Sequence, residues 1–328
     1  MNSFRTEVTI GPAERPLRYD DAILFMGSCF ASNMGGYFSD LSLNVMLNPF
    51  GVLYNPSSIA NGFERLLNPE PYRDRDVFQR DGLYHTFFHH SSFNSDDKSE
   101  FIKGINHSLQ QSSDFLRKAK AIVITFGTAW VYRHNELDMV VANCHKYSSG
   151  TFTRQLLSVN DVLSCYRPLL TRLRQLNPAL QLIFTLSPVR HWKDGAHGNQ
   201  LSKASLLLAI DQLVKEYDQA CYFPAYELLL DELRDYRFYA DDMLHPSKQA
   251  IAFIRSKFVE AHFDGDSTAI FDRLAKLRQA SQHRPFNRAS AAHQSFVRNH
   301  IQKVDTAQKQ FPGLDLTVLR KAFEAQVH

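Results

Sequence analysis

The sequence predicts an α/β fold, a three-layer α/β/α sandwich on a mostly parallel five-stranded sheet of the flavodoxin-like type, followed by a helical extension. Short continuous apolar runs alternate along the chain with longer amphipathic segments. Such runs are typical of parallel strands that helices cover on both faces. With 328 residues, 44% of them hydrophobic, the chain is long enough for one large domain with an appendage.

Five apolar runs are the candidate strands, and the clearest is 121–126, which contains only apolar or β-branched residues and alanine. The others are 22–26, 43–47, 180–186 and 221–223. Between them, apolar residues recur at helical spacing in 31–40, 97–119, 160–176 and 200–219. This order of strands and helices predicts the parallel sheet.

Two stretches depart from this alternation. Residues 48–95 form a long connection rich in Asn, Pro, Phe and His, and residues 130–142 resemble a hairpin that turns near His134. Long insertions in a compact domain usually carry binding or catalytic groups.

The domain division is expected near residue 263. Residues 1–263 form the α/β domain, and 264–328 form a basic helical extension. From 266 to 328 there are ten basic and five acidic residues, a net charge of +5, so the rest of the chain carries about −2 of the total of +3. The extension is interpreted as a solvated helical face, with an anion-binding surface and a homo-oligomer contact as alternatives.

Composition excludes several function classes. A net charge of +3 gives no reason to expect a nucleic-acid partner. No apolar run approaches the ~20 residues of a membrane span. The first 21 residues lack the apolar stretch of a secretory signal, and the four cysteines show no CxxC spacing. We therefore expect a cytoplasmic protein with reduced thiols.

Ser28 is the first candidate for chemistry, because it follows the first strand directly and precedes a helix. A serine there lies at the carboxyl edge of the sheet, where open α/β folds bind ligands. Its backbone N–H, near a helix N-terminus, is also placed to face an oxyanion. The alternatives are an N-cap, a phosphate cradle, or Cys29 as the nucleophile.

Asp242 and His245 are the second candidate, three residues apart after the last strand. One turn is enough to place a carboxylate against imidazole Nδ1, which leaves Nε2 free to deprotonate a serine. The alternative is an N-cap aspartate beside a surface histidine.

The chain resembles the GSCFA-domain family from about residue 20 to 260. The resemblance rests on GSCFA at 27–31, NPFG at 48–51, YNP at 54–56, GTAWVY at 127–132, ANCHK at 142–146, SPVRH at 187–191, KDG at 193–195 and RDYRFY at 234–239. That family is in turn similar to the SGNH/GDSL hydrolases, which are α/β/α enzymes acting on esters.

The second resemblance implies a role for each matching position. Ser28 matches the nucleophile, Asp242 the orienting acid and His245 the general base. Gly51 matches the glycine whose backbone N–H helps to form the oxyanion hole, together with the N–H of Ser28.

The chain departs from the superfamily at the third block, Gly-x-Asn. Here Ala129 stands where the asparagine would donate to the oxyanion. Losing one such donor typically costs about 100- to 1000-fold in rate. The Thr128 hydroxyl and Asn143 are the candidate substitutes.

Further polar side chains are expected to face the substrate: His89, His145, Arg190 and His191. Arg190 suits an anionic substrate group, with a structural salt bridge as the alternative. Trp130, Tyr132, Trp192 and Tyr239 suit a sugar-stacking wall or core filling. The histidines at 85, 89 and 90 lack the spacing of a standard zinc site, so no metal or cofactor is expected.

The sequence therefore predicts a serine esterase that hydrolyses a small acyl ester through a Ser-Asp-His triad and an acyl-enzyme. The substrate expected from the resemblance is a small-molecule or carbohydrate ester, such as an O-acetyl sugar. Two alternatives remain: a non-catalytic binding protein for a glycan or acylated metabolite on the same fold, and a site that handles phosphate or another anion.

Overall fold

Five parallel strands form the central sheet, in the order β10-β9-β5-β1-β2. In the computed structural model, which describes residues 5–327, they are β1 Ile23–Gly27, β2 Val45–Leu47, β5 Ala121–Phe126, β9 Gln181–Leu186 and β10 Ala220–Phe223. Counted along the chain, the spatial order is 2-1-3-4-5, the flavodoxin-like arrangement. The predicted three-layer fold is confirmed, and each of the five predicted strands is found.

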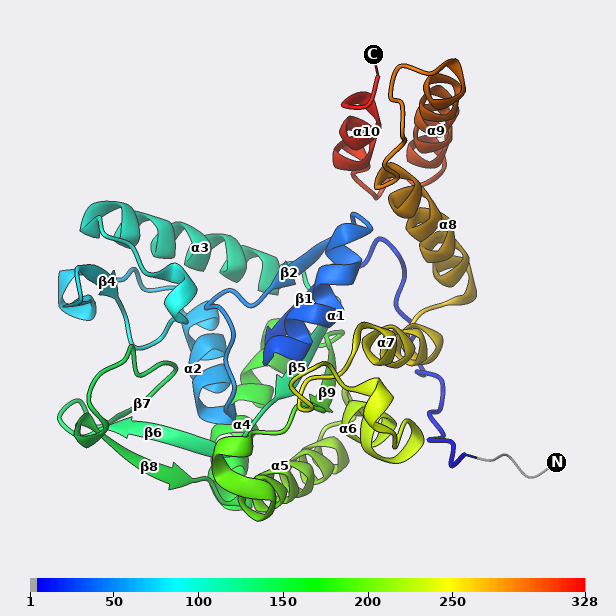
Figure 1. Cartoon of the computed structure of the whole chain (residues 1–328). Coiled ribbons are helices and arrows are strands. Elements are labelled where there is room, and N and C mark those ends of the chain that lie inside the picture. Colours follow the sequence, from blue (N-terminus) through cyan, green and yellow to red (C-terminus); the bar gives the residue numbers. More distant parts are fainter. Residues whose placement is uncertain (1–4, 328) are drawn as a thin grey trace.

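Helices cover both faces of this sheet, as Figure 1 shows. One face carries α2 Pro56–Leu67, α3 Lys98–Lys118, α4 Val159–Leu176 and α5 Gly195–Glu216. The opposite face carries α1 Cys29–Asp40, the short α6 Ala225–Glu227 with the π-helical turn Leu228–Glu232, and α7 Lys248–His262.

The two faces explain why the strands are apolar throughout. In β1, Leu24 and Met26 enter the hydrophobic core under α2–α5, whereas Ile23 and Phe25 enter the core under α1 and α7. All residues of β1 are buried. Successive side chains of a strand point to opposite faces, so a strand buried on both faces needs an apolar residue at every position.

The two irregular stretches contain more regular structure than the sequence analysis predicted. The connection after β2 contains α2 and a small hairpin, β3 Phe78–Arg80 with β4 Leu83–His85. The predicted hairpin after β5 is present as β6 Trp130–His134 and β7 Met139–Val141, and β8 Phe152–Leu156 adds a third strand beside β6. Single helical turns lie at Asp74–Asp76, Ser91–Phe93, Ser149–Thr151, Trp192–Asp194 and Tyr236–Phe238.

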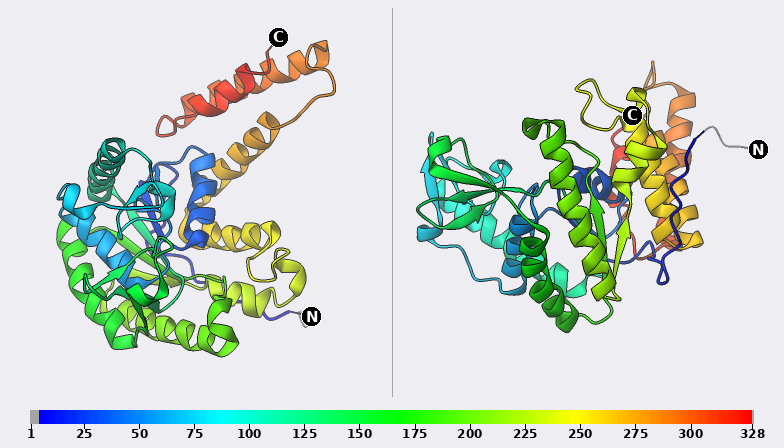
Figure 2. Two further views of the ribbon diagram at one scale, coloured as in Figure 1. Left: turned by 60° about the vertical axis from the view of Figure 1, so that its left-hand side comes forward. Right: turned by 90° about the horizontal axis from the view of Figure 1, so that it is seen from below.

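The C-terminal extension consists of α8 Gly265–Ser281, α9 Ala291–Gln310 and α10 Thr317–Glu324. Figure 2 shows these helices standing at the margin of the sandwich, with α8 leading away beside α1. Arg278 of α8 pairs with Asp40 of α1 at 2.7 Å, and the rings of Phe271 and Phe38 lie 5.8 Å apart. The extension therefore continues the core on the α1 face of the sheet.

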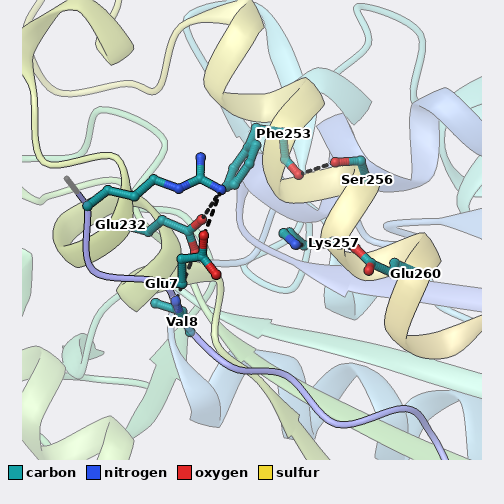
Figure 3. A network of polar contacts seen from close by, with 8 residues as sticks. Glu7, Val8, Glu232, Phe253, Ser256, Lys257 and Glu260 are labelled. Atoms are coloured by element: carbon teal, nitrogen blue, oxygen red, sulfur yellow. Dashed lines mark hydrogen bonds and ion pairs between the residues drawn. The ribbon is translucent and has the colours of Figure 1, made fainter. Parts of the chain in front are cut away.

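The chain before β1 crosses the outside of the domain as an extended segment. The backbone N–H of Val8 donates to Glu232 at 3.0 Å, a contact drawn in Figure 3. Further along, the backbone N–H groups of Ala13 and Leu17 donate to the carbonyls of Ala261 and His262, each at 2.7 Å. These bonds hold the segment against the π-helical turn and against α7.

No helix within residues 5–327 is long and apolar enough to cross a membrane.

Candidate active site

A cavity of about 570 Å³ opens at the carboxyl edge of the sheet. Its lining includes residues that follow three strands: Ser28 after β1, Thr128 after β5, and Ser187, Val189, Arg190 and His191 after β9. His245, which lies shortly before α7, also lines it. The strand order reverses between β1 and β5, and this switch point is where open α/β folds bind ligands.

Ser28 is both a helix cap and a lining residue of this cavity. It is the N-cap of α1, and its Oγ accepts the Phe30 backbone N–H at 3.3 Å. Its own backbone N–H donates to the Thr125 carbonyl at 3.2 Å. No acceptor for the Ser28 hydroxyl proton is found among residues 5–327. The N-cap and nucleophile interpretations are therefore compatible, but the Ser28 N–H already has a partner.

Asp242 and His245 form a hydrogen-bonded pair within one turn. Asp242 Oδ1 accepts the backbone N–H groups of Leu244 at 3.0 Å and His245 at 2.9 Å, while Oδ2 lies 2.5 Å from His245 Nδ1. The two backbone N–H groups and then the imidazole lower the pKa of Asp242 to about 2. The carboxylate is therefore ionised at neutral pH, and it holds the histidine proton on Nδ1.

Ser28 and His245 line the same cavity, but no hydrogen bond joins Ser28 Oγ to His245 Nε2 within the described residues. The side chains of Asp242 and His245 are about half exposed, so the pair lies at the rim. Catalytic hydrogen bonds are often long in unliganded enzymes and tighten when substrate binds.

Gly51 does not have the geometry expected of an oxyanion donor. Its backbone N–H donates to the Asn48 carbonyl at 2.7 Å within a tight turn, and Gly51 is not among the residues that line the cavity. Its φ of +77° and a Cβ position only 2.4 Å from His90 Cβ explain the glycine structurally. The expectation that Gly51 donates to the oxyanion is therefore corrected.

Thr128 and Asn143, the candidate substitute donors, both line the cavity. Thr128 Oγ1 lies 3.1 Å from Ser202 Oγ and accepts the Trp130 backbone N–H. Asn143 Oδ1 accepts the His145 backbone N–H at 2.8 Å, and no partner for Asn143 Nδ2 is found in residues 5–327. Asn143 thus has a donor to offer, whereas the Thr128 hydroxyl lies within hydrogen-bonding distance of Ser202.

His89 and His145 lie outside this cavity, so their expected substrate contacts are corrected. His89 is 1% exposed and bonds Thr86 Oγ1 at 2.7 Å, while His145 bonds the Thr86 carbonyl and stacks on His85 at 4.2 Å. Burial lowers the pKa of His89 to about 3 and that of His145 to about 4. Both are neutral: His89 packs within the connection between β2 and α3, and His145, after β7, packs against that connection.

Arg190 and His191 do line the cavity. Arg190 Nε is buried and has no hydrogen-bond partner among the described residues, and no ion pair of Arg190 is found there. This removes the salt-bridge alternative for Arg190 and leaves a guanidinium free to bind an anion.

Cys29 also lines the cavity, but its environment does not activate it. Burial raises the pKa of its thiol, so the thiol stays protonated at neutral pH. The alternative of Cys29 as nucleophile is thereby weakened. Within residues 5–327 no group of three or more His, Cys, Asp or Glu side chains is placed to hold a metal ion.

Lys203 is a polar residue beneath the site that the sequence analysis missed. It is 1% exposed, and its Nζ donates to the Gly127 carbonyl at 2.8 Å and the Ser187 carbonyl at 2.6 Å. Burial lowers its pKa to about 7. Its ammonium group therefore bridges the loops that follow β5 and β9. Its sequence signal is a lysine at helical spacing with the buried residues Asn199, Leu206 and Ile210 of α5.

The fold and cavity define a three-layer α/β/α protein with a polar site at the switch point of its sheet. The chain belongs to the GSCFA family: that family's sequence model matches residues 22–258, and the model of the GSCFA domain protein, C-terminal domain, matches 274–328. No curated protein matches the sequence.

Two solved structures are similar at low identity. One is described as a platelet activating factor from Streptococcus pneumonia, with 13% identity, a TM-score of 0.36, and coverage of 73% of this chain and 84% of that one. The other is an acetyl xylan esterase from the rumen bacterium Butyrivibrio proteoclasticus, with 12% identity, a TM-score of 0.38, and coverage of 74% and 63%.

Proposed function

We propose that this protein is a serine esterase that hydrolyses a small acyl ester. The observation that carries the proposal is the Asp242–His245 pair, whose histidine lines the same cavity at the sheet's switch point as Ser28. A carboxylate, an imidazole with its proton on Nδ1 and a serine hydroxyl are the three groups of nucleophilic acyl transfer.

The proposed reaction has two steps. His245 Nε2 takes the Ser28 proton as Ser28 Oγ attacks the ester carbonyl, and the tetrahedral adduct collapses when His245 returns that proton to the departing alcohol. Water then attacks the acyl-enzyme, again giving its proton to His245. The C–O bond to Ser28 breaks, the carboxylic acid leaves, and the proton from His245 restores the serine hydroxyl.

The proposed alcohol part is a carbohydrate, which accords with the family resemblance and with a cavity of about 570 Å³. Of the four expected stacking residues, Trp130 is covered by Arg154 at 4.0 Å, and Tyr132 bonds Lys193 through its hydroxyl at 2.7 Å. Trp192 lines the cavity and is 52% exposed, so it is the aromatic side chain best placed to stack on a sugar ring.

The test is labelling with a fluorophosphonate together with hydrolysis of p-nitrophenyl acetate. Wild-type protein is expected to be labelled at Ser28 and to hydrolyse the ester. Ser28→Ala is expected to lose both and to melt only a few degrees lower, because loss of the single N-cap hydrogen bond costs about 1 kcal/mol.

Cys29→Ala is the matched control, since it removes the neighbouring nucleophile and should leave labelling intact. If the wild-type protein is not labelled by the fluorophosphonate and hydrolyses none of a panel of esters, the esterase is rejected and the binding protein is favoured. Labelling that persists in Ser28→Ala and disappears in Cys29→Ala would reject Ser28 as the nucleophile.

The unpaired guanidinium of Arg190 favours substrates or ligands with an anionic group. We predict that Arg190→Gln raises KM for an ester with a carboxylate on its alcohol part by about 10- to 100-fold, the loss of one charge-assisted hydrogen bond. KM for the neutral p-nitrophenyl acetate should stay within about twofold. Equal effects on both esters in steady-state kinetics would show that Arg190 supports the cavity and does not bind the anion.

A further inference from the structure

The backbone N–H groups of the loop after β5 all have partners. Ala129 is fully buried, and its backbone N–H donates to Ser202 Oγ at 2.7 Å. The N–H groups of Gly127 and Thr128 both donate to the Tyr54 carbonyl, at 2.8 and 2.9 Å. The N–H groups of Ser28 and Gly51 are also paired, so the oxyanion donor is expected from a side chain, and Asn143 and His191 are the cavity residues considered for it whose side chains have a nitrogen without a partner among the described residues.

One ring nitrogen of His191 lies near the side chain of Ser28. A Cβ built on Gly127 would lie 3.4 Å from Ser28 Cβ and 3.5 Å from His191 Nε2. The serine and this imidazole nitrogen therefore border the same small space above Gly127. Both Ser28 and His191 also line the cavity.

The structure fixes the position of His191 from two sides. Its backbone N–H donates to Asn199 Oδ1 at 3.0 Å, and its ring meets Tyr54 edge to face, with the ring centroids 5.6 Å apart. Tyr54 is also the residue whose carbonyl binds the loop after β5. No hydrogen bond to either ring nitrogen of His191 is found within residues 5–327, so the neutral ring can carry its proton on Nε2 and, in that tautomer, donate it.

His191 is neutral at physiological pH. Burial, and then electrostatic interactions with Lys203 on α5, His245 before α7 and Arg154 on β8, lower its pKa to about 4. Burial and these neighbours all disfavour the charged imidazolium form of His191. A neutral imidazole donates a hydrogen bond without giving up its proton, so it does not compete with His245 as a base.

We propose that His191 is the oxyanion donor of this enzyme and takes the role that Ala129 cannot fill. This inference rests on the proposed function. When Ser28 Oγ bonds to the ester carbon, the π electrons of the carbonyl move to its oxygen, and the Ser28 proton goes to His245. His191 Nε2–H donates to that oxygen and keeps its proton throughout.

The test compares His191→Phe, which removes the donor, with His191→Gln, which restores an N–H. For p-nitrophenyl acetate, His191→Phe should lower kcat by about 100- to 1000-fold with KM within about threefold, and should slow fluorophosphonate labelling of Ser28 similarly. His191→Gln should recover at least about tenfold of kcat. The matched control is His197→Phe, an exposed histidine of α5, which should behave as wild type.

Unchanged kcat in a folded His191→Phe variant would overturn the inference, and so would a rise in KM alone, which would make His191 a binding residue. In either case, loss of activity in Ser28→Ala would leave the proposed esterase standing. If wild-type protein neither hydrolyses esters nor is labelled, both proposals fail together. If His191→Phe does not fold, the comparison is made between His191→Gln and His191→Glu, which have side chains of similar size. Only the glutamine side chain carries an N–H group that can donate, so equal kcat in these two variants would overturn the inference.

Discussion

Replacing Asp242 with asparagine is expected to lower kcat for ester hydrolysis by about 10³- to 10⁴-fold, with little change in KM or melting temperature. Asparagine Oδ1 still accepts the backbone N–H groups of Leu244 and His245, so the turn survives. Its NH₂ group cannot accept from His245 Nδ1–H, so the imidazole loses the partner that keeps Nε2 free for the serine proton.

The neighbouring Asp241 provides the matched control for this measurement. Asp241→Asn removes the same charge one residue away, where no hydrogen bond or ion pair is found among the described residues, and it should leave kcat within about twofold of wild type. Equal kcat for Asp242→Asn and wild type would make the Asp242–His245 pair a structural turn and remove the proposed base.

The sheet was predictable because both of its faces are buried. A strand such as β5, whose six residues are all buried, must be apolar at each position, and its bounds match the predicted run of 121–126. By contrast, α2 was hidden in a segment that composition marked as a loop. Its signals are present nonetheless: Asn55 caps the helix, Pro56 begins it, and Ile59, Phe63 and Leu66 recur on its buried face.

The site was predictable only where bonding is local. The three-residue spacing of Asp242 and His245 is enough to join them in one turn. His89 and Gly51 were misplaced because the sequence does not reveal whether a loop side chain or N–H turns toward the cavity or toward its own segment. Ser28, Gly127 and His191 follow the ends of three different strands, β1, β5 and β9. That Ser28 and His191 both lie close to Gly127 therefore depends on how these strands are arranged in the sheet, which only the folded structure reveals.

Acid is expected to destabilise the fold steeply between about pH 6.5 and 4, because buried histidines bind protons in the unfolded chain that they do not bind in the native state. His262 is 5% exposed between the rings of Phe223 and Phe258, and burial lowers its pKa to about 4. Between these pH values the unfolded chain holds a proton at this histidine that the native state lacks. The stability is therefore fully present above about pH 6.5 and decreases by about 1.4 kcal/mol per pH unit for each such histidine as pH falls.

The variant His262→Phe measures how much this one histidine contributes to the pH dependence of the free energy of unfolding. Phenylalanine suits the aromatic surroundings and removes the buried Nε2, which has no partner among the described residues. Its free energy of unfolding in urea at pH 7.5 should stay within about 1 kcal/mol of wild type, and its decline between pH 6 and 4.5 should be shallower by about 1.4 kcal/mol per pH unit. The control His107→Phe changes an exposed histidine of α3 and should keep the wild-type slope. A slope unchanged in His262→Phe would show that His262 takes up its proton equally in both states, and the acid sensitivity would have to come from other groups.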